Sequence, residues 1–499
     1  MSDLVRDTRL GKVTGFADGK VNRWFGIPYG LPPVGERRFK RSVEAQPWKG
    51  IRECTKMSPR PYDFLDGMMK KMMTGTNPYS EDCLYLNVWV PANVKPGDKR
   101  PVFVWIYGGA NHTGEASDPG YDLTAFAEKD IVAVNFNYRV GPLGFYDFSR
   151  LDPSFDSNCA LSDMLLALHW VQDNIEAFGG DPKQVTICGE SAGGTAVYTL
   201  LSCPSAQGLF QRAIAMSGLP DNVDWPRVQD LNIGLFLEAI GIAKEDISKL
   251  RELSPEDLQK GSNALVHNND VYPGILLSGA EVDGDLLPYK PWEAMGKGIS
   301  KDVPCIFGTC REEGTLFYML KMTPVNWDQV AQMLDNSGCA DKLTAFKKQY
   351  GHLKEKEAMT AIARDRMFWA YSIRCSDAQS EYNRVYRYRF DFESGMEKLS
   401  GLKATHGSDI GAGLDTWESL PKTLGMLTSK KTMQHVHDHL HGAFVHFVKT
   451  GDPNGGSIRG WAPYTKEDRE TMLINTECWL VRNPKGEDYP LWKDIELYR

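Results

Sequence analysis

The feature that most restricts the fold of this chain is a Gly-Glu-Ser-Ala-Gly pentapeptide at residues 189–193. An apolar run at residues 185–188 precedes it, and a helix-compatible stretch at residues 195–201 follows it. A serine at so sharp a strand-to-helix turn needs a strained backbone, and small glycines on either side avoid collisions. We therefore predict that Ser191 lies at a nucleophile elbow. The alternative is a glycine-rich turn with an incidental serine.

Other apolar runs predict the sheet to which this turn belongs. Residues 84–90, 102–107 and 131–137 are continuous apolar runs, typical of strands that helices cover on both faces. Residues 160–178 carry apolar side chains at helical spacing and end at Gly179-Gly180-Asp181-Pro182. This alternation predicts an α/β fold with a central, mostly parallel twisted sheet and helices on both faces.

The second half of the chain indicates helical insertions. Residues 224–298 and 327–382 have mainly helical patterns, and strand-like residues 303–308 and 384–390 follow them. No Pro/Ser-rich linker bounds either block. We therefore expect one domain over residues 1–499, although 499 residues alone would allow several.

Composition argues against several classes of function. A net charge of −8 without basic clusters disfavours nucleic-acid binding. No apolar stretch reaches the roughly 18 residues of a membrane span, and residues 1–7 lack the apolar core of a secretory signal. The ten cysteines form no Cys-x-x-Cys pair, which disfavours zinc and favours free thiols in a reducing compartment. We expect a cytoplasmic monomer or small homo-oligomer without cofactor or metal.

A nucleophilic serine needs a histidine base and a carboxylate, which follow it in the order acid, then histidine. His406 is the better base candidate because residues 404–409 form a loop of small residues; an ordinary loop histidine is the alternative. A metal site is the second possibility, since five histidines share one helical stretch. However, no His-Glu-x-x-His accompanies them, so we interpret them as surface histidines. They are His435, His437, His439, His441 and His446.

Several strings in the right order resemble the type B carboxylesterases, the carboxylesterase/lipase or cholinesterase-like family. They are Phe-Gly-Ile-Pro-Tyr at residues 25–29, Ser-Glu-Asp-Cys-Leu-Tyr-Leu-Asn at 80–87, Val-Trp-Ile-Tyr-Gly-Gly-Ala at 104–110, Asn-Tyr-Arg-Val-Gly at 137–141, Phe-Gly-Gly-Asp-Pro at 178–182, the pentapeptide at 189–193, and Thr-Gly-Asp-Pro at 450–453. The resemblance covers nearly the whole chain and implies the α/β-hydrolase fold. In style it is similar to the intracellular bacterial p-nitrobenzyl-type esterases.

The resemblance also implies roles for particular residues. It assigns the nucleophile to Ser191, the base to His406 and the acid to Glu313, with Glu312 as the rival if the alignment slips by one residue. The implied reaction is hydrolysis of small to medium carboxylic esters through an acyl-enzyme. The implied oxyanion hole consists of three backbone N–H groups, those of Gly109, Ala110 and Ala192.

The family further suggests two buried ion pairs, Arg38 with Glu81 and Arg139 with Asp163. Glu190, beside the nucleophile, either tunes the electrostatics of the site or is structural. Two departures from the family stand out. Asp409 replaces the glutamate usual three residues after the base. Asn111-His112 replaces an aromatic residue, which favours a polar acyl group or, alternatively, a supporting hydrogen bond.

Extracellular relatives join the cysteine equivalent to Cys83 to an upstream partner, but residues 55–80 contain no cysteine. A Cys54–Cys83 disulfide is therefore one alternative, and free thiols are the one that we favour. The intervening segment contains Met68, Met69, Met72 and Met73, which either form an adaptable pocket rim or belong to a packed surface helix. It contains no tryptophan, which argues against choline esters, because cholinesterases bind the quaternary ammonium by a cation–π contact with a tryptophan there. Two other functions remain alternatives: a catalytically dead adhesion protein, and a lipase with an apolar lid.

Overall fold

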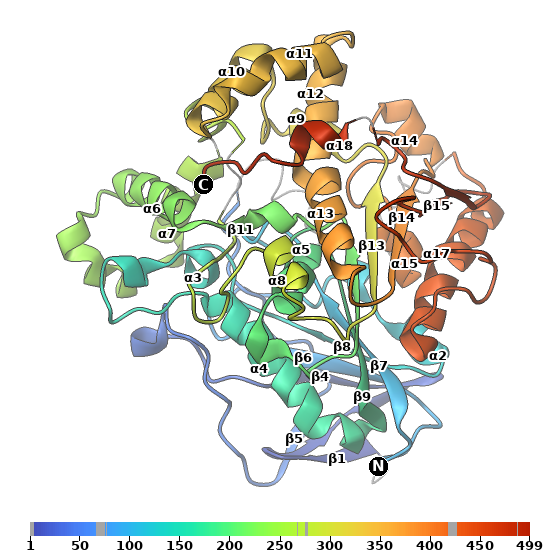
Figure 1. The fold of residues 1–499 in the computed structure, drawn as a ribbon. Coiled ribbons are helices and arrows are strands. Elements are labelled where there is room, and N and C mark those ends of the chain that lie inside the picture. Colours follow the sequence, from blue (N-terminus) through green and yellow to red (C-terminus); the bar gives the residue numbers. More distant parts are fainter. Residues whose placement is uncertain are drawn as a thin grey trace.

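The computed structural model describes residues 4–65, 75, 77–266, 268–274, 278–417, 427–486 and 488–499. These residues form an eleven-stranded sheet in the order β16-β15-β14-β13-β10-β9-β7-β8-β6-β4-β3 (Figure 1). The strands are β3 (Phe16–Asp18), β4 (Val21–Pro28), β6 (Tyr85–Pro91), β7 (Arg100–Ile106), β8 (Val132–Phe136), β9 (Gly180–Glu190), β10 (Arg212–Met216), β13 (Cys305–Cys310), β14 (Val385–Phe390), β15 (Thr471–Ile474) and β16 (Trp479–Val481). Neighbouring strands are parallel from β8 to β15 and antiparallel at both edges.

Side chains of β7 alternate between the two faces of the sheet, as a period of two residues requires. Val102 and Val104 belong to one core cluster, which contains Val197 of the helix after the elbow. Phe103 and Trp105 belong to the second cluster, on the opposite face. The two faces are therefore both covered, which explains why the central strands are continuous apolar runs.

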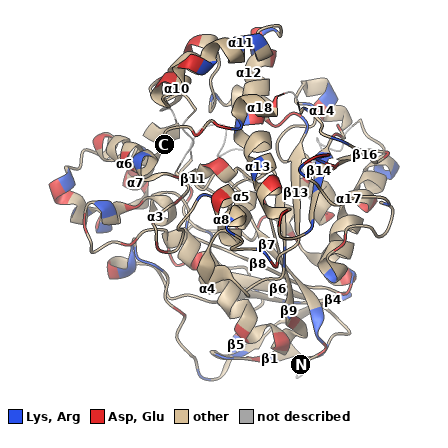
Figure 2. Ribbon diagram, in the orientation of Figure 1, with Lys and Arg blue, Asp and Glu red and all other residues tan. Residues whose placement is uncertain are grey.

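The helices follow the predicted alternation closely. They are α2 (Thr124–Glu128), α3 (Pro142–Phe145), α4 (Cys159–Asn174), α5 (Ala192–Leu201), α6 (Pro226–Ile240), α7 (Pro255–Val266), α8 (Pro291–Gly296), α9 (Gly314–Met319), α10 (Trp327–Asn336), α11 (Leu343–Tyr350), α12 (Glu355–Arg364), α13 (Ala370–Gln379), α14 (Gly395–Ser400), α15 (Ile410–Leu414), α17 (Lys430–Thr450) and α18 (Tyr489–Trp492). In Figure 1, α10 to α12 form the top of the molecule, and α6 and α7 its left side. Figure 2 shows charges of both signs mainly on helices and loops, around a largely uncharged sheet.

Among the strands that the sequence missed are three near the start of the chain. β1 (Val5–Thr8), β2 (Gly11–Thr14) and β5 (Ile51–Glu53) form a separate small sheet, and all three residues of β5 are exposed. The first insertion is also not purely helical, because β12 (Ala280–Glu281) pairs in parallel with β11 (Val223–Asp224). These strands are short and carry polar residues, so no apolar run marks them.

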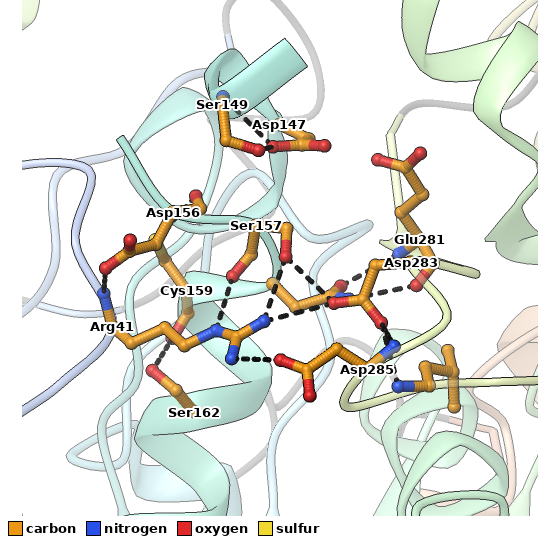
Figure 3. A network of polar contacts seen from close by, with 12 residues as sticks. Arg41, Asp147, Ser149, Asp156, Ser157, Cys159, Ser162, Glu281, Asp283 and Asp285 are labelled. Atoms are coloured by element: carbon orange, nitrogen blue, oxygen red, sulfur yellow. Dashed lines mark hydrogen bonds and ion pairs between the residues drawn. The ribbon is translucent and has the colours of Figure 1, made fainter. Parts of the chain in front are cut away.

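Polar contacts attach the segment after β12 to Arg41, near the start of the chain, and to the loop before α4 (Figure 3). The guanidinium of Arg41 donates to Asp285 Oδ2 at 2.6 Å and to Asp283 Oδ2 at 3.2 Å. The hydroxyl of Ser157 also donates to Asp283 Oδ2, at 2.8 Å. The first insertion is thereby held against the body of the sheet domain.

Both predicted ion pairs are confirmed. Arg38 Nε lies 2.8 Å from Glu81 Oε2. Arg139 binds Asp163 through two hydrogen bonds of 2.8 and 2.7 Å, with both residues almost completely buried.

All ten cysteines lie among the described residues, and each is a free thiol, Cys54 and Cys83 included. The methionine-rich segment around Met68, Met69, Met72 and Met73 lies outside the described residues. In the described part of the chain, no helix has the length and apolarity needed to cross a bilayer.

Candidate active site

The turn between β9 and α5 has the strained geometry that the sequence predicts. Ser191 adopts φ 58° and ψ −124°, a conformation that non-glycine residues rarely take. A Cβ on Gly193 would collide with the carbonyl oxygen of Ile106, and one on Gly189 with the backbone of Gly193. The N–H of Ser191 donates to the carbonyl of Met216 at 3.0 Å, which ties the turn to β10.

His406 and Glu313 converge on this serine from distant parts of the chain. Nε2 of His406 lies 2.8 Å from Ser191 Oγ, and its Nδ1 lies 2.7 Å from Glu313 Oε2. The imidazole packs against the rings of Phe317 and Phe368, with centroids 5.0 and 4.8 Å away. The hydrogen bonds and the ring contacts together fix the orientation of the imidazole.

The two candidate acids occupy different environments. Glu313 is fully buried at the start of α9, and its Oε1 accepts the backbone N–H of Cys310 at 2.6 Å. Glu312 is a quarter exposed and lies 3.7 Å from Arg311 and 3.9 Å from Lys403. The geometry therefore selects Glu313 as the partner of the imidazole, and Glu312 faces basic side chains.

Two further buried carboxylates surround the imidazole. Oε1 of Glu190 lies 3.4 Å from His406 Nε2 and accepts no hydrogen bond within the described chain. Burial raises the pKa of Glu190 to about 8, against the lowering effect of the imidazole. Asp409 accepts the hydroxyl of Tyr388 at 2.6 Å, and burial raises its pKa to about 6.

These carboxylates determine the basicity of His406. Burial lowers the pKa of the imidazole, but Glu190 and Glu313, with a smaller contribution from Asp409, outweigh burial and raise it to about 9. A more basic imidazole accepts the serine proton more readily, and the surrounding negative charge stabilises the imidazolium that results.

The glycine-rich loop after β7 borders the pocket that contains Ser191. The carbonyl of Gly109 accepts the N–H groups of His112 at 3.0 Å and Thr113 at 3.1 Å. Because a peptide is planar and trans, the N–H of Ala110 points away from those two donors. Ala192 is the first residue of α5, so its N–H has no acceptor within the helix. Ala110, Ser191 and Ala192 line one pocket.

Asn111 and His112, which depart from the family pattern, are bound to protein groups. The amide of Asn111 donates to the carbonyl of Ser278 at 3.2 Å. The buried ring of His112 bridges the carbonyl of Ala110 at 3.0 Å and the hydroxyl of Tyr146 at 3.1 Å. Burial lowers the pKa of His112 to about 4, so its ring is neutral at physiological pH. These contacts favour the alternative in which both residues support the loop.

The interpretation of the α17 histidines as surface residues is wrong for three of them, because His437, His439 and His441 are buried. His439 contacts Ser457 Oγ at 2.7 Å, and His441 contacts the carbonyl of Gly413 at 3.0 Å. Among the described residues, no group of three or more His, Cys, Asp or Glu side chains is arranged to hold a metal ion.

Sequence reasoning missed most of the residues that enclose the site, because it placed only Ala110 and Ala192 there besides the catalytic groups. The pocket beside Ser191 is lined by Ala110, Ala192, Leu219, Asn222, Phe317, Met322 and Met367. Leu219, Phe317 and Met367 come from three separate segments, so no motif groups them. Only their convergence in the folded chain identifies them.

A strained nucleophile elbow, an imidazole and a buried carboxylate at the carboxyl edge of a parallel sheet define a serine hydrolase with the α/β-hydrolase fold. Comparison with known proteins agrees. The chain belongs to the carboxylesterase family, which matches residues 2–492. The protein is accordingly a serine carboxylesterase, a hydrolase of carboxylic esters, and not a catalytically dead adhesion protein.

Its relatives extend over almost the whole chain. It is 33% identical to the para-nitrobenzyl esterase of Bacillus subtilis over 98% of each chain. It is 30% identical to the phenmedipham hydrolase of Pseudarthrobacter oxydans over 95% of each chain. A solved structure of a PNB esterase has a TM-score of 0.89 and 31% identity, covering 98% of this chain and 99% of that one.

Proposed function

We propose that this carboxylesterase hydrolyses small to medium esters through an acyl-enzyme on Ser191, with His406 as general base and acid and Glu313 orienting the imidazole. The observation that carries the proposal is the pair of short contacts at the two ring nitrogens, 2.8 Å to Ser191 Oγ and 2.7 Å to Glu313 Oε2. A serine hydroxyl becomes an effective nucleophile only beside such a base.

In the first half-reaction, His406 Nε2 takes the proton of Ser191 as Oγ attacks the ester carbonyl carbon. The imidazolium then donates that proton to the leaving alkoxide, and the acyl group stays on Oγ. In the second half-reaction, a water molecule gives a proton to Nε2, attacks the acyl carbon and releases the carboxylic acid. Ser191 regains its proton, so the enzyme is unchanged.

The oxyanion formed in each step would bind the N–H groups of Gly109, Ala110 and Ala192. The orientation of the Gly109–Ala110 peptide and the unused first N–H of α5 support this assignment. The loss of one donor of this kind costs about 3 kcal/mol of transition-state stabilisation. Leu219, Phe317, Met322 and Met367 give the pocket an apolar wall, which favours uncharged groups next to the reacting carbonyl.

The wider setting is proposed on separate observations. One domain over residues 1–499 is supported because a single core cluster joins Val104 of the sheet with Phe236 and Leu334 of the two insertions. Ten free thiols favour a cytoplasmic location. The net charge of −8 argues against nucleic acid as a partner. The assembly is proposed to be a monomer or small homo-oligomer.

Labelling with an organophosphate tests the nucleophile. Mass spectrometry of the digested protein should locate one adduct, on the peptide that contains Ser191, and the Ser191→Ala variant should remain unlabelled. An adduct at another residue, or none in the wild type, contradicts the mechanism.

A series of p-nitrophenyl esters of increasing acyl length then separates esterase from lipase. We expect activity on soluble esters of short and medium acyl chains. A preference for long chains that emerges only above the solubility limit of the substrate would favour a lipase.

A further inference from the structure

A second, polar pocket adjoins the catalytic pocket. Asn222 lines both pockets, Asp221 and Arg366 line the second, and Met367 lines the first. Two segments therefore form the wall between them, the turn η7 (Pro220–Asn222) and the π-helical turn η11 (Asp365–Trp369). A single π-helical turn inside a helical region is often found at a functional site.

Arg366 is the unusual group of the second pocket. The residue is only 3% exposed, and its Nε and Nη1 have no hydrogen-bond partner among the described residues. Within the described chain it forms no ion pair, whereas Arg364, two residues earlier, pairs with Asp365 at 2.6 Å. Burying guanidinium N–H groups without acceptors is costly in free energy, so proteins rarely retain such an arrangement unless something binds it.

The other charged groups of this pocket already have partners. The ammonium of Lys290 donates to the carbonyl of Asp221 at 3.2 Å and lies 3.8 Å from the Asp221 carboxylate. Asp224 accepts the N–H of Gly279 at 2.9 Å, and burial raises its pKa to about 7, which reduces its negative charge near neutral pH. Arg366 is therefore the cation left for a ligand.

We propose that Arg366 binds a carboxylate at the far end of the substrate, so that this esterase favours anionic esters such as half-esters of dicarboxylic acids. The acyl carbonyl would lie at Ser191, the acyl chain would pass Asn222, and the distal carboxylate would reach Arg366. Guanidinium groups bind carboxylates through several charge-assisted hydrogen bonds, which suits a planar anion better than a neutral group. The inference rests on the proposed esterase function.

The test compares monoethyl succinate, glutarate and adipate with ethyl butyrate, valerate and hexanoate, and follows acid release in a pH-stat. We expect kcat/KM of the wild type to be higher for the half-ester than for the neutral ester at one or more chain lengths. Arg366→Met should lower that ratio about 10- to 100-fold, the range for hydrogen bonds to a charged group. Arg366→Lys should retain part of it.

Arg227→Met is the matched control. Arg227 is exposed, its Nη1 donates to the carbonyl of Arg499 at 3.3 Å, and its replacement removes one positive charge outside both pockets. The ratio should stay at the wild-type value in this variant. A wild-type preference for neutral esters at every length, or a ratio that Arg366→Met leaves unchanged, overturns the inference. Hydrolysis of the neutral esters would still support the proposed function.

A binding measurement keeps the inference testable if Arg366→Met does not fold. Calorimetry on the Ser191→Ala variant should show tighter binding of the half-ester than of its neutral counterpart; equal binding counts against the inference. Free glutarate should compete with the half-ester at the substrate site of the wild type. If glutarate instead inhibits without competing, the pocket takes a separate anion, and the assignment to substrate is wrong.

Discussion

Replacement of Glu313 by glutamine tests how the carboxylate acts on the imidazole. The side chain keeps its size, but the N–H of Cys310, which donates to Oε1 at 2.6 Å, requires an acceptor at that position. The amide oxygen of glutamine must take that place, so its NH2 group faces Nδ1 of His406. Nδ1 then accepts a hydrogen bond, and the ring proton moves to Nε2. In that tautomer Nε2 is unable to accept the proton of Ser191.

The size of the effect follows from the geometry. Nδ1 and Oε2 are 2.7 Å apart, and Glu313 is fully buried. Two unit charges about 4 Å apart at an effective dielectric constant of about 20 attract each other by about 4 kcal/mol. That attraction forms when the imidazole becomes charged in the transition state, so its loss lowers kcat about 10³-fold. Above about pH 9, where the imidazole of the ground-state complex is neutral, KM should change little.

The assay is steady-state hydrolysis of p-nitrophenyl acetate, with circular dichroism to verify that each variant is folded. Glu312→Gln is the matched control, because it makes the same change one residue away on a carboxylate beside Arg311 and Lys403. We expect it to retain kcat within a few-fold of the wild type. A loss below about 10-fold in Glu313→Gln, or an equal loss in the two variants, would refute the reasoning.

Three further predictions concern pH and stability. The pKa of His406 is raised to about 9 and the base must be neutral, so kcat/KM should rise with pH toward that value. Glu190→Gln should lower the pH at which kcat/KM is half-maximal, because it removes a carboxylate that raises the pKa of His406. A shift of this pH upward would contradict the account. Burial raises the pKa of Glu281 from 4.5 to about 9, so the folded state holds a proton that the unfolded state releases, and stability should fall as pH rises between these values. Glu281→Gln should make stability depend less on pH. Measured by urea unfolding, the free energy of unfolding should rise by about 1–3 kcal/mol at pH 8 and little at pH 5. Equal gains at both pH values would count against this prediction. Asp163→Ala strands the buried charge of Arg139 and should cost about 3–5 kcal/mol of unfolding free energy; a loss below about 1 kcal/mol would show that the pair is dispensable.

The central part of the fold could be predicted from sequence because its strands are buried on both faces. Residues 102–107 were predicted as a strand, and the structure has β7 at Arg100–Ile106. The sequence did not reveal the strands β5 and β12, because their stability comes from pairing with neighbouring strands and no apolar run marks them. The α17 histidines show the same limit: helical spacing was visible, but which faces other segments cover was not.

The sequence by itself determined the elbow, because only glycine fits at residues 189 and 193 and the constraint is local in the chain. It also supplied one histidine and two neighbouring glutamates as candidates for the other roles. Tertiary structure decided that Glu313 meets an imidazole 93 residues away, which in turn meets a serine 215 residues from it. It also left Nε and Nη1 of Arg366, beside the catalytic pocket, without a hydrogen-bond partner in the part of the chain that the structure describes. Contacts of this kind depend on how separate helices and strands pack, and short-range patterns carry no record of that packing.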